Sequence, residues 1–260
     1  MFSFISNLIN RKKQPVMTTD ILTLIPARIK ATRLPGKPLA EIAGKPMICH
    51  VWEKAVKADL GPVFVATDSP EIAQTIEAVG GRAVLTAANH PSGTDRIYEA
   101  LCHIDPEGRY EEVINLQGDL PELDPALLEK LAEMLRDPNW DLTTLAAPAS
   151  QEEAVKSQIV KAVVSFTDNN KRAGQALYFS RAAVPDGPEG FLHHIGLYGW
   201  RRKALSTFVH LPPSPLELSE KLEQLRALEA GMKIGIAVVD HAPGGIDTAD
   251  DLAEVRLRLG

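Results

Sequence analysis

Residues Ile21–Pro38, ILTLIPARIKATRLPGKP, begin as a short apolar run and continue as a basic loop. The run 21–25 predicts a buried strand that stops at Pro26, and the loop leaves its carboxyl end. The loop has no acidic residue and carries four cations in a chain of net charge −6: Arg28, Lys30, Arg33 and Lys37. Open α/β sheets bind ligands at this end of their strands, and Arg and Lys together suit a chain of phosphates. We therefore interpret the loop as a phosphate-binding loop, with a solvated basic loop as the alternative.

Gly36 supports this interpretation, because it lies between Pro35 and Pro38. The two prolines restrict the backbone, and glycine allows it to come close to a ligand.

Strand-like and helical patterns alternate through the first half of the chain. Residues 45–58, 71–79 and 94–104 have helical spacing, whereas 62–66, 82–86 and 112–116 resemble buried strands. Ser92 with Asp95 has the pattern of a helix N-cap, and Asp124-Pro125 is typical of a helix start. This order predicts a parallel sheet with right-handed crossovers.

The pattern changes after Asp141. Four more strand-like runs follow, at 141–146, 159–166, 176–180 and 194–200. A helix is expected over 216–230, then a strand over 234–239 and a last helix over 248–259. We expect one α/β domain over residues 20–260, with a Rossmann-like, mostly parallel sheet. A smaller β-rich lobe, inserted at about 150–188, would close over the site and mediate dimerisation.

The composition is that of an ordinary soluble protein, with 45% hydrophobic and 24% charged residues. Cys49 and Cys102 do not make a disulfide framework and are expected to be buried thiols, which suits a reducing cytoplasm. The acidic balance argues against a nucleic-acid-binding surface.

Residues 1–19 are expected to form an extension outside the domain. Their apolar cluster is short and precedes Arg11-Lys12-Lys13, which is the wrong order for a secretory signal. It is also much shorter than a membrane span, so we expect no stable membrane insertion. A weak surface-associating segment is the alternative, and Met17 offers a second start.

Two aspartates are candidate metal ligands. Asp119 follows a strand in a Gly-Asp turn, where it could also be an ordinary turn residue. Asp247 precedes the last helix, but Thr248 with Asp251 already supplies a capping box there. Two carboxylates from separate loops, with phosphate oxygens and water, are a typical site for a hard divalent cation.

An ordered set of motifs resembles one known family. The motifs are PAR and TRLPGKP in the basic loop, GKPMI at 44–48, VATD at 65–68, SGTDR at 92–96, NLQGD at 115–119, YFSR at 178–181, HIGLYG at 194–199, LEQLR at 222–226 and DT at 247–248. In this order they resemble the 3-deoxy-manno-octulosonate (Kdo) cytidylyltransferases, also called CMP-Kdo synthetases. The resemblance covers roughly residues 20 to 259.

The resemblance implies a CTP-dependent nucleotidyltransferase. In that family CMP passes from CTP to the anomeric hydroxyl of Kdo, giving CMP-Kdo and pyrophosphate for lipopolysaccharide biosynthesis. By the same resemblance, Asp119 and Asp247 hold a catalytic Mg²⁺ against the CTP phosphates, and the enzyme is a cytoplasmic homodimer.

Further residues receive roles from the same motifs. Arg28 and Lys37 would bind the phosphates, with Arg33 as a supporting cation. Ser92 and Gly93 resemble the cytosine-facing loop, and Arg96 would turn toward the bound substrates. The sugar acid would be bound by five side chains: Gln117, Arg181, His194, Glu217 and Glu220. For Arg181 a surface salt bridge, and for His194 a core position, are the alternatives.

The chain departs from the family pattern at three places. Ala31 stands where the family usually has Ser, Leu120 replaces an acid with Glu122 two residues later, and Val184-Pro185-Asp186 replaces Ile-Pro-Trp. All three lie around the expected sugar end of the site. A cytidylyltransferase for another 2-keto sugar acid, such as 8-amino-Kdo or a nonulosonate, is therefore an alternative. A non-catalytic nucleotide-binding protein is a second alternative, although a protein that only binds a nucleotide needs no pair of metal-binding aspartates.

Overall fold

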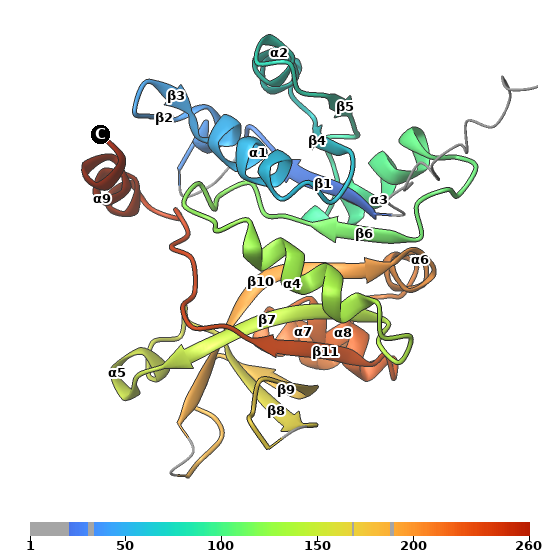
Figure 1. Ribbon diagram of the computed structural model, residues 1–260, viewed down its shortest axis with the longest axis vertical. Helices are drawn as coiled ribbons and strands as arrows, with labels where there is room; N and C mark the ends of the chain where they lie inside the picture. Colours follow the sequence, from blue (N-terminus) through green and yellow to red (C-terminus); the bar gives the residue numbers. More distant parts are fainter. Residues whose placement is uncertain (1–20, 31–33, 168, 188–189) are drawn as a thin grey trace, which may run out of the picture.

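A computed structural model describes residues 21–30, 34–167, 169–187 and 190–260 (Figure 1). Ala31, Arg33 and the extension 1–19 lie outside the described residues. The described strands form a nine-stranded sheet and a small hairpin. The sheet order is β5 (Ala83–Leu85), β4 (Val63–Thr67), β1 (Ile21–Ala27), β6 (Glu112–Asn115), β10 (Phe191–Arg201), β7 (Leu142–Ala149), β11 (Ile234–Val238), β9 (Ala173–Ser180) and β8 (Lys161–Phe166). The hairpin pairs β2 (Glu41–Ile42) with β3 (Lys45–Pro46).

The described helices are, in chain order, η1 (Lys37–Leu39, a 3₁₀ turn), α1 (Met47–Lys57), α2 (Pro70–Ala78), α3 (Gly93–Ile104), α4 (Ala126–Leu135), α5 (Gln151–Ala154), α6 (Arg202–Val209), α7 (Pro215–Glu220), α8 (Gln224–Glu229) and α9 (Ala249–Leu259). In the described part of the chain, no helix is long and apolar enough to span a membrane.

The sheet is mixed, which corrects the expectation of a mostly parallel sheet. From β5 through β4 and β1 to β6 all neighbours are parallel. Beyond β6 most neighbours are antiparallel: β10 runs antiparallel to β6 and β7, and β9 runs antiparallel to β11 and β8, whereas β7 and β11 are parallel. The reason is local for β8 and β9, since a short turn joins them and a short connection allows only antiparallel pairing.

β8 and β9 come from the segment expected to form a separate lobe. They are hydrogen-bonded to the edge of the same sheet through β11, and β10 also reaches β8. The segment is thus β-rich and continuous with the main sheet, and its roles in closure and dimerisation stay predictions.

Two layers of helices cover the sheet. Side chains alternate along β1, so that Ile21 and Ile25 pack with α1, α2 and α4, whereas Leu22 and Leu24 pack toward α3, α6 and α8. Figure 1 shows α1 and α4 on the near face. The core therefore has two halves separated by the sheet, and β1 lies buried between them.

Three local predictions need correction. The first strand continues through Pro26 to Ala27, because β6 pairs with β1 only as far as Leu24 and a proline is tolerated where one side of a strand is unpaired. The expected helix over 216–230 is two helices, since Lys221 has the left-handed conformation with φ 56°. Cys102 is exposed because it lies on the solvent face of α3, whereas Cys49 is buried; both are free thiols.

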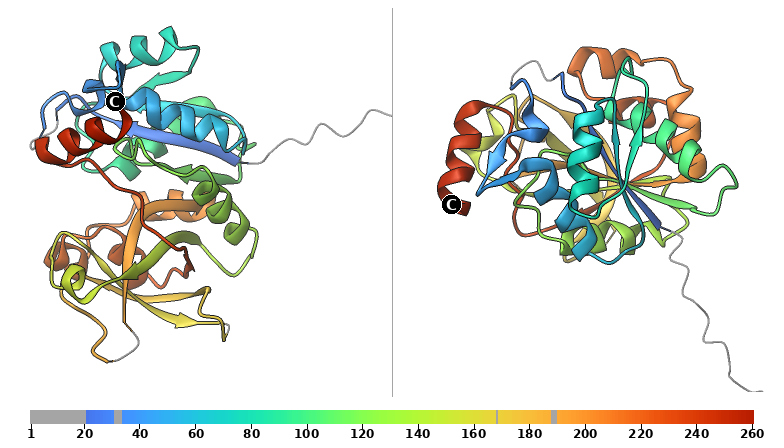
Figure 2. Two further views of the ribbon diagram at one scale, coloured as in Figure 1. Left: turned by 60° about the vertical axis from the view of Figure 1, so that its left-hand side comes forward. Right: turned by 90° about the horizontal axis from the view of Figure 1, so that it is seen from above.

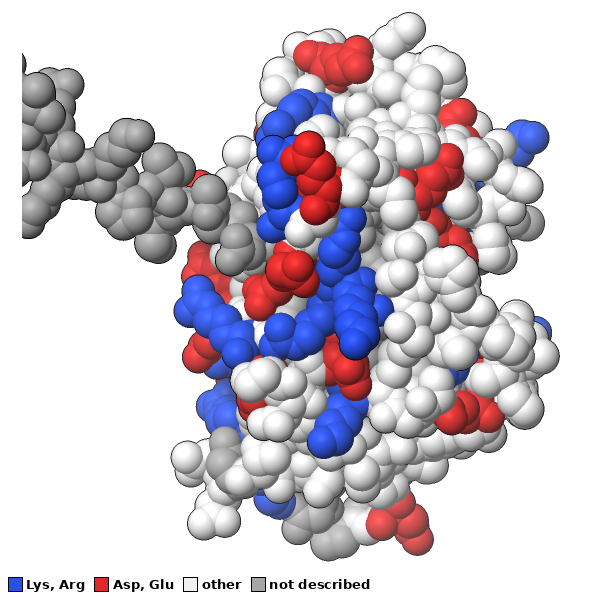
Figure 3. Space-filling model, turned by 90° about the vertical axis from the view of Figure 1, so that its right-hand side faces the viewer, with Lys and Arg blue, Asp and Glu red and all other residues white. Residues whose placement is uncertain are grey.

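The side of the molecule drawn in Figure 3 carries acidic side chains among the basic ones. A surface of mixed sign differs from the single-sign surface that is typical of nucleic-acid binding.

Candidate active site

A pocket of about 440 Å³ lies at the carboxyl ends of β1 and β6. The chain leaves β1 toward β4 on one side and later returns through α3 to β6 on the other side. Such a reversal of strand order is the usual place for a ligand in an open α/β sheet. Eight predicted site residues line the pocket: Arg28, Lys37, Ser92, Gly93, Arg96, Gln117, Asp119 and Asp247.

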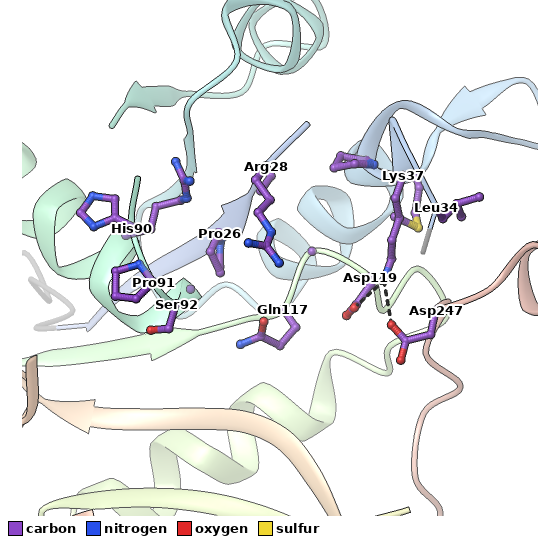
Figure 4. A pocket seen from close by; sticks show the side chains of 16 residues that line it. Pro26, Arg28, Leu34, Lys37, His90, Pro91, Ser92, Gln117, Asp119 and Asp247 are labelled. Atoms are coloured by element: carbon purple, nitrogen blue, oxygen red, sulfur yellow. Dashed lines mark hydrogen bonds and ion pairs between the residues drawn. The ribbon is translucent and has the colours of Figure 1, made fainter. Parts of the chain in front are cut away.

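Lys37 lies at the end of the pocket where Asp119 and Asp247 are found (Figure 4). Its ammonium Nζ lies 2.8 Å from Asp119 Oδ2 and 3.2 Å from Asp247 Oδ1. Gly36 places it there, because Gly36 has φ 70° and the 3₁₀ turn η1 begins directly after it. A left-handed residue at this point favours glycine, and the expected close approach of the Gly36 backbone to a ligand stays a prediction.

The two aspartates come from loops that touch each other. The amide of Ile246 donates a hydrogen bond to the carbonyl of Asp119 at 3.1 Å. Thr248 and Asp251 form the predicted capping box at the start of α9, and the Asp247 amide also donates to Asp251. Residues 128 positions apart in sequence (247 − 119) therefore face one point.

The donor set fits a divalent cation. Both carboxylates already converge on one positive group, the Lys37 ammonium. Among the described residues, no group of three or more His, Cys, Asp or Glu side chains could hold a metal. A Mg²⁺ ion at this place would therefore depend on phosphate oxygens and water for its other ligands, which is the arrangement that Mg²⁺ favours.

Arg28 projects into the space between the cluster of Lys37, Asp119 and Asp247 and the loop that carries Ser92 (Figure 4). Ser92 is the N-cap of α3, where its hydroxyl accepts hydrogen bonds from the amides of Thr94 and Asp95. This confirms the predicted cap. A side chain at Gly93 would meet Pro26 at 3.2 Å, so glycine permits the loop to pack closely on the end of β1.

Arg96 lines the pocket, but its guanidinium is buried and bound to protein groups. Nη1 donates to Thr86 Oγ1 at 2.6 Å, and Nη2 lies 3.8 Å from Asp68 Oδ2. Burial lowers the pKa of Arg96, and the nearby Asp68 opposes that effect. In this structure the Arg96 guanidinium is held by Thr86 and Asp68 at the pocket lining, and its turn toward the substrates stays a prediction.

Of the five predicted sugar-binding residues, Gln117 lines the pocket and the other four lie outside its lining. Arg181 donates to the carbonyls of Glu220 and Ser157, at 2.8 and 2.9 Å. The Glu220 carboxylate accepts from Ser180 Oγ at 2.7 Å. These bonds join the end of β9 to α7, so a structural role for Arg181 is visible while its sugar-binding role is untested.

His194 and Glu217 are also bound by protein groups. His194 Nε2 lies 3.0 Å from Thr144 Oγ1, and burial lowers the pKa of His194 to about 3. Glu217 forms a two-bond ion pair with Arg226, at 2.5 and 2.8 Å. The structure does not bring the side chains of His194 and Glu217 together with Lys37, Asp119 and Asp247.

Glu223 was not among the predicted site residues, but the structure places it next to Thr94, beside the loop that carries Ser92 and Gly93. Its carboxylate is buried, and Thr94 Oγ1 donates a hydrogen bond to it. Burial raises the pKa of Glu223, and its second oxygen and the amide nitrogen of Gln224 have no hydrogen-bond partner among the described residues. The only signal in the sequence was the LEQLR motif, because a helix-face carboxylate gives no other indication.

His90 and Glu99 were missed as well. His90 lines the pocket and is hydrogen-bonded to Glu99, which also accepts from the amide of Ala87 at 2.9 Å. Glu99 lies on α3, so this helix holds the loop 87–92 at two points. Nothing in the sequence pattern marks these residues, because their pairing depends on the fold.

Comparison with known proteins gives a consistent result. A family model described as cytidylyltransferase matches residues 22–234. A protein of Methylobacterium radiotolerans named 3-deoxy-manno-octulosonate cytidylyltransferase is 55% identical over 242 residues, which are 93% of this chain and 97% of that protein. The chain belongs to the 3-deoxy-manno-octulosonate cytidylyltransferase family. A Parvibaculum lavamentivorans protein of the same name is 54% identical over 92% of both chains.

Solved structures agree with this membership. CMP:2-keto-3-deoxy-manno-octonic acid synthetase complexed with CTP is similar with a TM-score of 0.84 and 40% identity, over 92% of this chain and 97% of the other. A cytidylyltransferase from Leptospira borgpetersenii has a TM-score of 0.59 at 15% identity, over 91% of this chain and 85% of the other, so that likeness concerns the fold alone. This member of the Kdo cytidylyltransferase family is therefore an α/β enzyme, as expected from its motifs.

Proposed function

We propose that this protein transfers CMP from CTP to the anomeric hydroxyl of Kdo, releasing CMP-Kdo and pyrophosphate, and so serves lipopolysaccharide biosynthesis. The observation that carries the proposal is the convergence of Lys37, Asp119 and Asp247 in one pocket with Arg28. Two cations and two carboxylates around one space suit a triphosphate with its divalent cation.

In the reaction, the hydroxyl oxygen of the sugar forms a bond to the α-phosphorus while the bond from that phosphorus to pyrophosphate breaks, and the hydroxyl proton passes to the solvent. Arg28 and Lys37 bind and orient the phosphates, and Arg33, outside the described residues, is proposed to support them. Asp119 and Asp247 would hold Mg²⁺, which when bound neutralises charge that develops on the phosphoryl oxygens. Chemistry of this kind depends on positioning and charge rather than on a protein nucleophile.

At the other end of the pocket, the loop of Ser92 and Gly93 would face the cytosine. The sugar acid would approach from the side of Gln117. In the described part of the chain, Glu223 and Gln224 each have a buried side-chain polar atom with no hydrogen-bond partner. Buried polar atoms of this kind gain most from a ligand that forms hydrogen bonds with them. Arg181 directly follows β9, His194 lies in β10, and Glu217 and Glu220 lie in α7. These four side chains would contribute when that part of the chain closes on the substrate.

The departures from the family pattern bear on the choice of sugar. Leu120 is buried in the core, and Glu122 is paired with Arg258. Neither side chain lines the pocket, so these two changes leave the proposed substrate contacts as they are, which favours Kdo over another 2-keto sugar acid. We also propose a cytoplasmic homodimer, with exposed Leu216 and Leu218 of α7 as candidate contacts.

Pyrophosphate release tests the proposal. With Mg²⁺, release should be fastest for CTP and Kdo, and much slower when CTP is replaced by ATP, GTP or UTP. A nonulosonate or 8-amino-Kdo that reacts faster than Kdo would favour the alternative substrate. A protein that binds CTP and releases no pyrophosphate with any of these acids would be a nucleotide-binding protein.

A further inference from the structure

The C-terminal helix α9 lies apart from the layers that cover the sheet. It packs beside the β2–β3 hairpin (Figure 2). A small core of its own joins Leu252 and Val255 to Ile42 and Met47, with Leu34 and Ala40 packed against it. Arg256 Nε also donates to the carbonyl of Glu41 at 2.8 Å. These contacts hold one side of α9 to the segment that begins with the Lys37 loop.

The same helix is attached to the loop that carries Asp119. Arg258 donates two hydrogen bonds to Glu122, from Nε at 3.1 Å and from Nη2 at 2.6 Å. Glu122 lies three positions after Asp119. The hydrogen bonds from Arg258 hold the pKa of the Glu122 carboxyl below its usual range. Paired guanidinium–carboxylate bonds fix direction as well as distance.

The position of these bonds along α9 matters for Asp247. Asp247 directly precedes the N-cap of α9, whereas Arg258 lies near the other end of this 11-residue helix, about 16 Å away. At its N-terminal end the helix is held through Ile246, which packs in the small core and binds the Asp119 carbonyl. The bonds of Arg258 to Glu122 attach the far end of α9 to the loop of Asp119, whereas Leu252, Val255 and Arg256 attach the helix to the hairpin segment.

We propose that Glu122 and Arg258 are positioning residues for the two-carboxylate site. Through α9 they set the spacing of Asp119 and Asp247, although neither of the pair lines the pocket. The inference rests on the proposed function, because it concerns the same aspartates. It also gives a role to Glu122, at which this chain departs from the family pattern.

The ion pair of Glu122 with Arg258 is expected to affect the spacing of Asp119 and Asp247 more than the free energy of unfolding. The side chains of Arg258 and Glu122 are 50% and 22% exposed. Ion pairs at this exposure contribute little to the free energy of unfolding. A loss of the pair should therefore leave the fold intact and change how well the aspartates act together.

Four variants test the proposal: Glu122→Gln, Arg258→Gln, the charge reversal Glu122→Arg with Arg258→Glu, and the control Glu254→Gln. Glu254 is exposed on α9 and only 3.8 Å from Arg258, so its loss removes a charge from the helix without detaching it. For each protein, Mn²⁺ binding in the presence of CTP is measured by electron paramagnetic resonance. The Mg²⁺ concentration for half-maximal pyrophosphate release is the second readout.

Each single variant of the pair should bind Mn²⁺ about three- to tenfold more weakly and need correspondingly more Mg²⁺. The charge reversal should recover most of this loss, and Glu254→Gln should resemble the wild type. Single variants with wild-type Mn²⁺ affinity, or a reversal no better than the singles, would overturn the proposal. A wild-type protein that fails to bind Mn²⁺ with CTP and to release pyrophosphate would instead contradict the proposed function.

Discussion

At the scale of single residues, the Lys37 ammonium reports how closely Asp119 and Asp247 approach one another. One cation at 2.8 and 3.2 Å from the two carboxylates means that both carboxylates can serve one ion. Lys37 was recognisable from its loop and the aspartates from their turns. That all three meet follows from the packing of α9 against the Lys37 loop, which no local pattern encodes.

Asp119→Asn and Asp247→Asn should fold normally and each lose about 100-fold or more in kcat, because charge at the α-phosphate is stabilised mainly in the transition state. The double variant should lose much less than the sum of the two free energies, since both side chains serve one ion. Steady-state kinetics at saturating CTP measures this. Strictly additive losses, or near-native turnover of either single variant, would show that the aspartates do not share a metal.

His194 should make the stability of the protein depend on pH. Its folded-state pKa is about 3 and its ordinary value is 6.5, so between these values the unfolded chain takes up a proton that the folded protein excludes. The contribution of the neutral ring is fully present above about pH 6.5 and falls by about 1.4 kcal/mol per pH unit as the pH drops toward 3. Denaturant unfolding from pH 7 to pH 4 checks this. His194→Gln should flatten the dependence by that slope, and an unchanged slope would contradict the assignment.

At the scale of elements, local sequence predicted those features that depend on a few neighbouring residues. The caps at Ser92 and Thr248 formed as expected, because hydroxyl and carboxyl side chains bind nearby amides. The division of α7 from α8 was missed, since Lys221 is not a residue that usually adopts positive φ. Its conformation is imposed by contacts on both sides, including the ion pair of Glu217 with Arg226.

This imposed conformation gives a test at the junction of α7 and α8. Lys221→Val should destabilise the protein by about 1–2 kcal/mol, because a β-branched residue is poorly tolerated at φ 56°. Lys221→Gly should be neutral or slightly stabilising. Lys203→Gly in α6 is the matched control and should cost about 1 kcal/mol, as glycine does within a helix. Thermal or denaturant unfolding that ranked the two glycine variants in the opposite order would be incompatible with the left-handed assignment.

At the scale of the whole molecule, alternation of strands and helices predicted the α/β class and the parallel half of the sheet around the pocket. The mixed half was not predictable, because strand direction there depends on which strands become neighbours. The same limit applies to the site. Sequence motifs predicted Arg28, Lys37, Asp119 and Asp247, which the structure brings into one pocket, and their binding of phosphates stays a prediction. The contacts of Arg181 with Ser157 and of Thr94 with Glu223 could not be predicted, because they join segments 24 and 129 positions apart.

Deletion of residues 1–16 should leave the fold and turnover essentially unchanged. Among the described residues, the first strand begins at Ile21 and supplies side chains to the core on both sides of the sheet. Circular dichroism, solubility and kcat of the shortened protein, which would start at Met17, provide the comparison. An insoluble product, or the loss of most of the activity, would mean that the extension takes part in folding or catalysis.

We propose that this pocket converts CTP and Kdo into CMP-Kdo and that Asp119 and Asp247 are needed for the conversion. Phosphorus NMR of a mixture of protein, Mg²⁺, CTP and Kdo tests it most directly, because a triphosphate, a phosphodiester and pyrophosphate give separate signals. We predict that the wild-type protein produces the phosphodiester and pyrophosphate in equal amounts, and that Asp119→Asn does so about 100-fold more slowly. The absence of a phosphodiester signal with the wild type, or equal rates for the two proteins, would contradict the account.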